Sequence, residues 1–452
     1  MSITADQELH LLFQELKRVF SKTYIEEKAV ETGFMKRKTK LKPEYFLLLC
    51  SCLGDSFGKK SLVQLCAQLC ATFGLELTTE GLNQRFNSQA VKFLKEIFES
   101  IFSKQVAKPI IEKRLFERIR IMDSTSFEVP SNYGEYKGTR GSGVKIQLEY
   151  ELYQASFLHL LVQEGRENDN NYPKVIRDDI KHGDLCLRDL GYFSVSNLDD
   201  INQRQGYYLS RMKNNMNLYQ QEKNGDWVNI DLEKIKKKLK RGEVMELQNI
   251  KVGYWVKKPL ISRVVIAKLT KEQEAQRKLS LDKKKKKGKK PLSAEKNISL
   301  NIYLTNIPQS EVKKEEIHPL YSLRWQIEIL FKTWKSLFEI QRVKKMKKER
   351  FECHLYGTLI RLLLSSTLAF QCRRMLYKKH QMETSEYKSI SIAKECLSLF
   401  KDIVGNQNIL DELYIRIYQS IKVNGRKCRR QQKKTVFDIL KIAYKQTMAI
   451  AS

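Results

Sequence analysis

The alternation of apolar and polar residues divides the chain into helical and strand-rich stretches. Residues 1–112 follow the helical period, and two amphipathic runs stand out, KSLVQLCAQLCATFG and TTEGLNQRFNSQAVKFLKEIFESIF. Ser61 is predicted to cap the first helix and Gly74 to end it, while Thr78 or Thr79 caps the second. A helix, a glycine turn and a second helix are typical of a helix-turn-helix, but also of two packed core helices. The pattern leaves both interpretations open.

From about residue 117 the period changes to that of a strand-rich α/β unit. The run RIRIMDSTSFEVP is predicted to be a strand ending on Asp123, and DLCLRDLGYF a strand with Asp189 at its end. The other strands are predicted in VKIQLEYELY, SFLHLLVQE and GYYLSRMK. Helices are predicted in NNYPKVIRDDIKHG and SVSNLDDINQRQ.

Residues 216–300 have a different character. WVNIDLEKI, EVMELQNIKVGYWV and LISRVVIAKL are strand-like, and a dense cationic run follows at Lys283–Lys287, Lys289 and Lys290. Such a run is expected to form a solvated, mobile loop. NISLNIYLTNIP then returns to a strand pattern, and from about residue 350 the chain is predicted to be helical, closing on the basic stretch 424–434.

The composition of the chain indicates which kind of molecule it binds. The 452 residues are 42% apolar, which allows real hydrophobic cores in more than one module. A net charge of +31 selects polyanionic partners, nucleic acid first and an anionic membrane surface second, although a merely lysine-rich protein remains an alternative. The most apolar stretch, 356–370, is judged too short to span a bilayer, and no secretory signal is recognised. The odd count of 9 Cys without paired C-x-x-C spacing favours packed thiols in a reducing cytoplasm.

The stretch YSLRWQIEILFKTWK, residues 321–335, is the strongest amphipathic pattern in the chain. On one continuous helix its polar residues fall within an arc of about 80°. They are Tyr321, Arg324, Glu328, Lys332 and Lys335. Taken alone this is also the pattern of a surface salt-bridge ladder, because Arg324 and Lys332 each lie four residues from Glu328.

The two strand-end aspartates change that interpretation. Asp123, Asp189 and Glu328 together supply what a two-metal phosphoryl-transfer site needs, since carboxylate oxygens bind Mg²⁺ or Mn²⁺. Two such ions activate the attacking oxygen and stabilise the leaving one. The neighbouring cations would then hold phosphates of a DNA strand against the metals.

At this point the sequence resembles the DDE transposases of bacterial insertion sequences, in the branch named for insertion sequence four. That branch carries a Y-x2-R-x3-E-x6-K signature, which Tyr321, Arg324, Glu328 and Lys335 match in register. The D-S-T motif of the first acid is present at 123–125 and the D-x-G-Y-F motif of the second at 189–193. The resemblance covers about 117–370 well and the N-terminal region loosely.

The resemblance implies an α/β fold: a ribonuclease-H-like catalytic core interrupted by a mainly β insertion and flanked by helical N- and C-terminal regions. Asp123 is expected on the first core strand, Asp189 just after the fourth and Glu328 on a late helix. The implied divisions are an N-terminal DNA-end-binding region, a first core part, an insertion with the Lys-rich loop, a second core part and a helical, dimerising C-terminal region. Their boundaries are 1–112, 113–215, 216–300, 301–372 and 373–452.

The same resemblance implies an enzyme, a Mg²⁺-dependent DNA endonuclease and strand transferase. It is expected to bind the terminal inverted repeats of its own element, cleave the ends through a hairpin and join the 3′-ends to target DNA. Asp123, Asp189 and Glu328 would be both the catalytic residues and the ligands of two Mg²⁺ ions, with Mn²⁺ as a substitute. Synapsis of two ends implies a homodimer on double-stranded DNA, in the bacterial cytoplasm at the nucleoid.

Four residues are implied to contact DNA: Tyr321, Arg324, Lys335 and, more weakly, Lys332. Trp227 or Trp255 could hold a flipped base, although each could equally pack locally within a strand. The alternative function is a catalytically silent, repeat-binding regulator or inhibitor of transposition, against which the three intact acids argue. A structural or membrane-surface protein would account for the charge but not for the acids.

Overall fold

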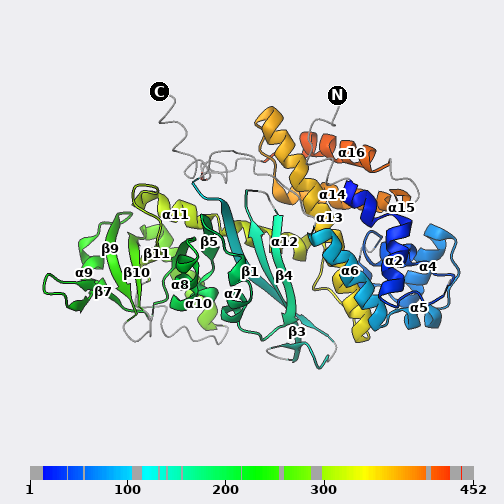
Figure 1. The fold of residues 1–452 in the computed structure, drawn as a ribbon, viewed down its shortest axis with the longest axis horizontal. Helices are drawn as coiled ribbons and strands as arrows, with labels where there is room; N and C mark the ends of the chain where they lie inside the picture. The colour runs from blue at the N-terminus through cyan, green and yellow to red at the C-terminus, as the bar shows by residue number, and fades with distance from the viewer. Residues whose placement is uncertain are drawn as a thin grey trace.

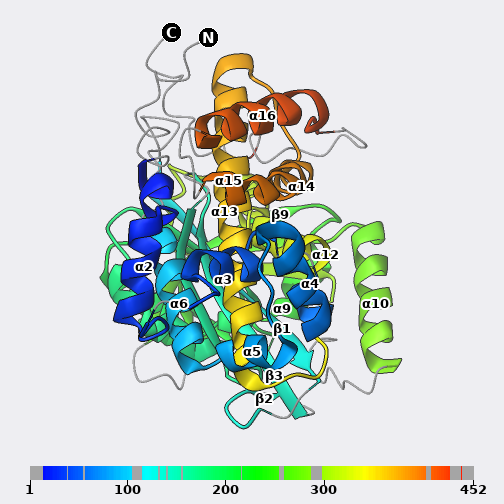
Figure 2. The same cartoon turned by 90° about the vertical axis from the view of Figure 1, so that its right-hand side faces the viewer.

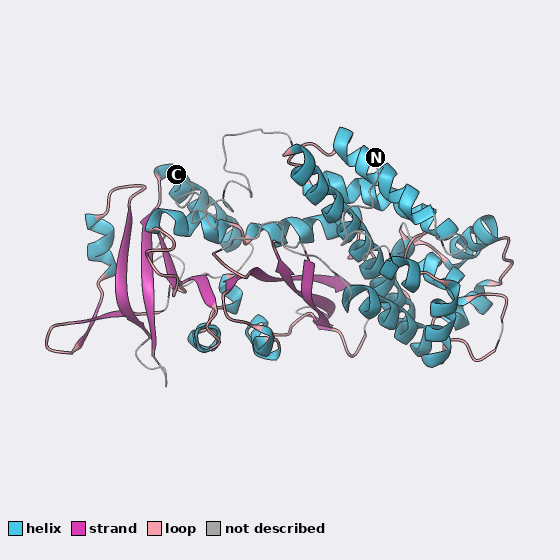
Figure 3. Ribbon diagram, turned by 45° about the horizontal axis from the view of Figure 1, so that its top comes forward, coloured by secondary structure: helices cyan, strands magenta, loops and turns pink. Residues whose placement is uncertain are grey.

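The computed structural model of the protein describes most of the chain. The described residues are 14–37, 39–53, 56–103, 115–130, 133–138, 141–153, 156–214, 216–253, 259–286, 298–403, 409–427 and 439. Strands run from one end of the elongated molecule to its middle, and helices fill the other end (Figure 3). The fold is therefore a mixed α/β architecture built on one central sheet, as the hydrophobic pattern predicts.

Five strands form the core of that sheet in the spatial order β4-β3-β1-β5-β6. β3 runs antiparallel to both β4 and β1. β5 runs parallel to β1, and β6 runs parallel to β5. This order and these directions are consistent with the ribonuclease-H-like core that the family resemblance implies. The strands are β1 (Arg118–Val129), β3 (Gly141–Glu151), β4 (Ser156–Glu164), β5 (Asp184–Arg188) and β6 (Tyr207–Arg211), with the two-residue β2 (Lys137–Gly138) on the edge of β3.

The sheet continues beyond β6 without a break. The next strand is β11 (Leu300–Thr305), and the strands of residues 216–300 follow it in the order β10-β9-β7-β8. These residues therefore extend the core sheet instead of forming a separate one. Their elements are β7 (Leu218–Gln221), β8 (Trp227–Asn229), β9 (Val244–Val252), β10 (Leu260–Lys268), and the helices α9 (Leu232–Lys238) and α10 (Lys271–Lys286).

Short helical segments connect the core strands. Only short helical turns form where NNYPKVIRDDIKHG predicts one helix, because the backbone leaves helical geometry at Ile176. The predicted helix in SVSNLDDINQRQ is present, capped by the Ser194 hydroxyl. The segments are η3 (Asp169–Asn171), α7 (Tyr172–Val175), η4 (Arg177–Asp179), η5 (Leu190–Tyr192) and α8 (Val195–Gln203).

The helical N-terminal part packs on the long helix of residues 348–380, at the helical end of the molecule (Figure 1). Ser61 caps α4 in a capping box with Gln64, and Gly74 ends that helix in the left-handed conformation, both as predicted. The second predicted helix is divided in two at Phe86, where the backbone leaves helical geometry and Asn87 accepts a bond from the new helix. The elements are α2 (Lys22–Glu31), α3 (Pro43–Cys50), η2 (Phe57–Lys59), α4 (Leu62–Phe73), α5 (Thr79–Arg85) and α6 (Ser88–Ser103).

The 33-residue helix α13 (Lys348–His380) is the central helix of the helical end. It packs on α6, α14 and α16, and approaches α3 so closely that a Cβ on Gly357 would collide with the Cys50 carbonyl oxygen. Within the described residues it alone has the length and composition to cross a membrane, but 89% of its apolar window is buried in the fold. The prediction of a short apolar stretch at 356–370 is corrected: the stretch belongs to a long core helix. The other C-terminal elements are α14 (Glu386–Cys396), η6 (Leu397–Leu399), α15 (Phe400–Ile403) and α16 (Ile409–Asn424).

Two further expectations are wrong in residues 216–300. WVNIDLEKI is a strand only to Asn229, because the Asp231 carboxylate accepts from the amides of Glu233 and Lys234 and starts α9. The backbone of Lys283–Lys286 belongs to α10, not to a loop. The remaining lysines of that run lie outside the described residues, as does most of the basic stretch 424–434.

Candidate active site

The register of the sheet brings Asp123 and Asp189 together. Met122 on β1 is aligned with Arg188 on the parallel strand β5, so the next residues, Asp123 and Asp189, are neighbours across the two strands. Asp123 does not end its strand as predicted, because β1 continues to Val129 against β3. Asp189 does follow the end of β5, in an extended conformation before a tight turn.

Glu328 reaches the aspartates from a helix that is not the continuous one expected. Residues 321–335 belong to α11 (Lys314–Ser322) and α12 (Trp325–Leu337), which meet at Leu323 and Arg324. At the junction the Arg324 amide donates to the Tyr321 carbonyl three residues back, and the Ile327 amide does the same to Arg324. The helix is therefore overwound there, and Arg324 and Glu328 lie at the start of a new helix.

The apolar side of α12 holds it against the sheet, as predicted. Ile327, Leu330 and Trp334 are fully buried, and the Trp334 ring packs edge-on against Phe157 of β4 at 6.1 Å. This packing holds α12 against the sheet, where it contacts β1.

Arg324 links the three acids. Its Nη2 donates to Glu328 Oε1 at 2.7 Å, and its Nη1 lies 3.5 Å from both Asp123 Oδ2 and Asp189 Oδ1. The guanidinium is 9% exposed, whereas the side chains of Asp123, Glu328 and Asp189 are 17%, 31% and 41% exposed. The cation therefore lies beneath the carboxylates, which face the solvent.

Three carboxyl groups around one guanidinium leave an excess of negative charge. Burial, and then the charge of Asp189, raises the pKa of Asp123 to about 7. Burial acts to lower the pKa of Arg324, but the surrounding negative charge, that of Asp189 first, outweighs it and the net shift is upward. Ionisation of all three carboxyl groups at once is therefore unfavourable, and a bound cation would stabilise the ionised form.

Tyr321 and Lys335 both make contacts within the protein. Tyr321 is 4% exposed, donates to the Arg188 carbonyl at 3.4 Å, and has the Arg324 guanidinium 5.8 Å from its ring centre. It therefore supports Arg324 from below. Lys335 is half-buried and donates to the Ser126 carbonyl at 3.1 Å, while Lys332 is exposed.

A fourth acid, not identified from the sequence, stabilises the first-acid motif from the opposite face of β1. Asp169 Oδ1 accepts bonds from Ser124 Oγ at 3.1 Å, Gln147 Nε2 at 2.9 Å and Lys145 Nζ at 3.1 Å. The Ser124 amide in turn donates to Asp123 Oδ1 at 2.8 Å. Asp169 lies in a connection without a strand or helix pattern, so no periodic signal marks it.

The donor set fits hard divalent cations. Asp123, Asp189 and Glu328 offer carboxylate oxygens that converge on one positive group, and such oxygens are the ligands that Mg²⁺ and Mn²⁺ prefer. With Arg324 between them, no group of three acids, histidines or cysteines in the described part of the chain is close enough to hold an ion. The fit therefore rests on the chemistry of the donors and on their excess negative charge.

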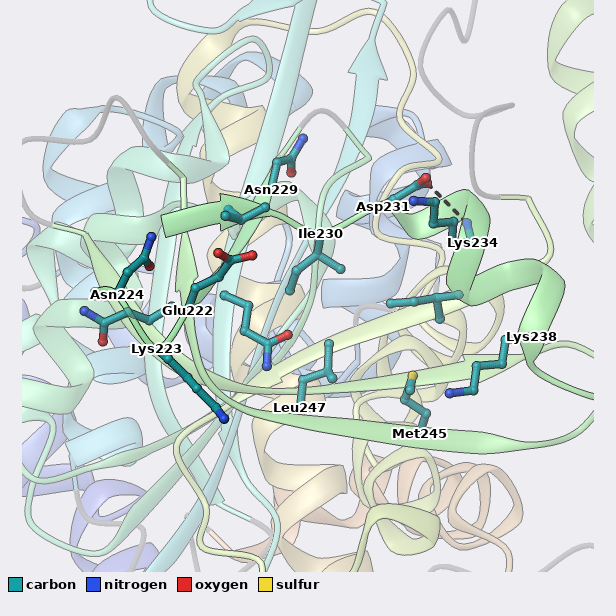
Figure 4. Close-up of a pocket in the computed structure, with 14 residues that line it drawn as sticks. Glu222, Lys223, Asn224, Asn229, Ile230, Asp231, Lys234, Lys238, Met245 and Leu247 are labelled. Atoms are coloured by element: carbon teal, nitrogen blue, oxygen red, sulfur yellow. Dashed lines mark hydrogen bonds between the residues drawn. The ribbon is translucent and has the colours of Figure 1, made fainter. Parts of the chain in front are cut away.

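A separate groove of about 930 Å³ lies on residues 216–300 and contains none of the three acids. Lys223 and Asn224 line it from the β7–β8 turn and Lys234 and Lys238 from α9, above an apolar floor that includes Leu247 (Figure 4). Trp227 is half-buried in β8, with Lys251 Nζ 5.4 Å from its ring, and Trp255 lies outside the described residues. The choice between the two tryptophans stays open.

The chain is similar to known proteins both in the region of the three acids and along nearly its whole length. Residues 114–364 match the family described as the transposase DDE domain, and that range contains all three acids. Several curated relatives align over nearly the whole chain.

Three of these relatives are informative. The chain is 40% identical to the transposase for insertion sequence element IS231C of Bacillus thuringiensis subsp. berliner, over 98% of each chain. It is 39% identical to the transposase for insertion sequence element IS231F of Bacillus thuringiensis subsp. israelensis, again over 98% of each. It is 33% identical to the transposase for insertion sequence element IS1151 of Clostridium perfringens, over 97% of each.

Proposed function

This chain belongs to the bacterial insertion-sequence transposases with a DDE domain, and from that premise we propose that it cleaves the ends of its own element and joins them to target DNA. The observation that carries the proposal is the convergence of Asp123, Asp189 and Glu328 on Arg324 from three separate elements. A surface salt-bridge ladder would need only Glu328 and its helix neighbours. It does not account for two aspartates from the sheet.

Asp123, Asp189 and Glu328 would hold two Mg²⁺ ions, which when bound supply Lewis-acid activation of the attacking and leaving oxygens of a phosphodiester. The chain's own residues set the geometry. The register of β1 and β5 fixes the two aspartates side by side, and the buried face of α12 fixes Glu328 above them.

The cations of the site have distinct tasks in this proposal. Arg324, supported by the buried Tyr321, holds the carboxylates in one cluster and offers charge to a phosphate that enters it. Lys335 is tied to β1 through the Ser126 carbonyl, so its charge is held beside the strand that carries Asp123. Lys332 is exposed and would contact the DNA backbone more loosely.

The finer divisions follow the family. The helices of 1–112 would bind the terminal repeats, residues 216–300 would contact DNA, and residues 373–452 would support a homodimer. Residues 216–300 carry 23 Lys and Arg against 10 Asp and Glu, which suits a DNA-facing surface. Cleavage through a hairpin and action at the nucleoid are proposed on the same grounds.

The test is cleavage of a duplex taken from the ends of the encoding element. Wild type, Glu328→Gln and the control Glu315→Gln would be compared with Mg²⁺ and with EDTA on a denaturing gel. Glu315 is an exposed acid of α11 outside the cluster, so its variant should cut like wild type. Cutting by wild type and the control with Mg²⁺ only, with Glu328→Gln binding but silent, is the expected result. Tight binding by all three proteins without any cutting would instead support the silent regulator.

A further inference from the structure

The row of side chains that contains Asp123 and Asp189 continues onto the next strand. β6 lies parallel to β5, with Leu185 aligned to Tyr207 and Leu187 to Leu209. Two residues further, the same register places Arg211 beside Asp189 on the same face of the sheet. Across the sheet, Asp123 on β1 and Asp189 after β5 are therefore followed by Arg211 on β6.

Arg211 belongs to a small group of cationic and polar side chains. Across the sheet it is aligned with Tyr303 of β11, whose hydroxyl lies 2.6 Å from Nδ1 of His318 on α11. The Tyr303 ring also lies 5.3 Å from the ring of Tyr321, which supports Arg324. The group is thus connected to the acid site by direct contacts.

Arg277 of α10 completes the group. Its guanidinium donates only to neutral acceptors: the carbonyls of Ile298 and Leu300 at 2.9 and 3.0 Å, and Asn301 Oδ1 at 2.5 Å. Burial, and then the like charge of Arg211, lowers the pKa of Arg277 to about 10. Arg277 binds Asn301, which lies two residues along β11 from Tyr303 and therefore on the same face of the sheet as Arg211. Within the described chain neither arginine forms an ion pair with a carboxylate.

His318 adds an exposed imidazole ring. Desolvation of its ring and the charges of the two arginines lower its pKa, which keeps the imidazole neutral at pH 7. Burial raises the pKa of Tyr303, so its hydroxyl stays protonated. The hydroxyl lies 2.6 Å from Nδ1 of His318, and either group can be the donor in this contact, which holds the imidazole ring beside Tyr303.

We propose that Arg211, Arg277 and His318 form a binding site for one phosphate of the DNA strand, next to the phosphate held at the three acids. The proposal rests on the proposed function, because the strand is the one cleaved there. Two guanidinium groups without a carboxylate partner and an exposed imidazole suit a phosphate diester, whose oxygens accept several charge-assisted bonds. α10 projects from the body of the molecule beside this site, so Arg277 also joins the site to a helix with an exposed, charged surface (Figure 2).

The experiment removes the charge of Arg211 by mutation and the charge of single DNA phosphates by chemical substitution, separately and together. Binding of the full chain to the end duplex would be measured in EDTA, with a neutral methylphosphonate placed at each phosphate around the cleavage position. Arg211→Ala, Arg211→Lys and His318→Ala would be compared with wild type. Arg166→Ala, an exposed arginine on a distant connection, is the matched control. Melting temperatures of all variants would show that each is folded.

Wild type and Arg166→Ala should lose about 5-fold in affinity at one methylphosphonate beside the cleaved phosphate. Arg211→Ala should bind the unmodified duplex about 5-fold more weakly, be indifferent to that methylphosphonate, and show a salt slope smaller by about 1. Arg211→Lys should recover most of the affinity, and His318→Ala should show a smaller loss at the same phosphate.

Wild-type phosphate sensitivity in Arg211→Ala, or no sensitive phosphate beside the cleavage position in wild type, would overturn the phosphate site. Cleavage by wild type in Mg²⁺ would leave the transposase proposal standing in that case. Conversely, the methylphosphonate effect could depend on Arg211 although the protein never cuts DNA. That result would support the phosphate site and contradict the proposed catalysis.

Discussion

Two arginine-centred clusters lie on opposite faces of β1, and they are built differently. Arg120 is fully buried and binds both oxygens of Glu149 at 3.1 and 2.6 Å, while Asp184 is 3.1 Å away and also pairs with Arg118 at 2.5 Å. Two arginines there balance two acids. On the other face, Arg324 is the one cation among the described residues that pairs with the three acids, two of them at 3.5 Å.

The difference separates a structural network from a site prepared for a ligand. In the Arg120 cluster each charge is compensated by a short bond, and the side chains of Arg120, Glu149 and Asp184 are at most 1% exposed, so nothing remains for another ion to neutralise. In the Arg324 cluster the contacts are longer, the acids are partly exposed and their charge exceeds that of the cation. Uncompensated charge in an open position is what a cation or a phosphate–metal complex can use.

The largest effect that this comparison predicts is on cleavage. Asp123→Asn removes one carboxylate from the open cluster, and we expect it to lower the rate of end cleavage by at least about 10³-fold, because metal-held charge contributes several kcal/mol. Affinity for the end duplex in EDTA should be unchanged or slightly higher. The rate would be measured by single-turnover cleavage of a labelled duplex.

Asp199→Asn is the matched control, since Asp199 is an aspartate of α8 outside the cluster whose carboxylate only accepts from Gln203. If Asp123→Asn cut at a rate within tenfold of wild type, the three acids would not form the reaction centre.

The second prediction concerns the closed cluster. Arg120→Met removes the central cation and leaves the buried Glu149 without its partner, which should lower the free energy of unfolding by about 3–5 kcal/mol. The measurement is the urea unfolding midpoint followed by circular dichroism. Arg120→Met combined with Glu149→Leu should recover part of the loss, because an apolar pair replaces the ion pair. Equal stability of wild type and Arg120→Met would remove the contrast between the clusters.

Much of the candidate site could be predicted from the sequence because its signals are local. The apolar runs before Asp123 and Asp189 identified two strands, and the spacing from Tyr321 to Lys335 identified Glu328. Parallel strands place such acids at one edge of a sheet, so their proximity followed once the strands were paired. The apolar face of α12 was also correct, because burial follows the helical period over the whole stretch.

What could not be predicted depends on contacts between distant segments. The break at Arg324 arises from overwinding at the junction of α11 and α12, which the helical period does not reveal. Burial of Tyr321 follows from its contact with Arg188, and the role of Asp169 from its contact with Ser124. Arg211 also ends a strand, but an arginine at a strand end is not by itself a signal of a metal or phosphate site.

The third prediction uses the pH dependence of stability in metal-free buffer. The pKa of Asp123 is about 7 in the folded protein, against an ordinary value of 3.8, so the folded state binds the proton more tightly. The stability that this group contributes is present below pH 4 and is lost as the pH rises to about 7. Asp123→Asn should therefore gain stability relative to wild type across that interval, by about 2 kcal/mol after discounting for partial exposure. Thermal unfolding in EDTA at pH 4.5, 6 and 8 would measure it. A constant difference between the two proteins across that range would contradict the raised pKa.

The smallest predicted effect compares Lys332 and Lys335 on α12, at the rim of the open cluster. Lys332 is exposed and free to move, so Lys332→Ala should weaken binding to the end duplex only about 2-fold and lower the salt slope by about 1. Lys335 is half-buried and fixed by the Ser126 carbonyl, so its ammonium is already ordered and Lys335→Ala should cost about 10-fold. Filter binding between 50 and 200 mM salt, a range over which phosphate contacts weaken measurably, separates the two. Equal losses would mean that pre-ordering of the ammonium does not matter, and that the cations around the open cluster act only through their total charge.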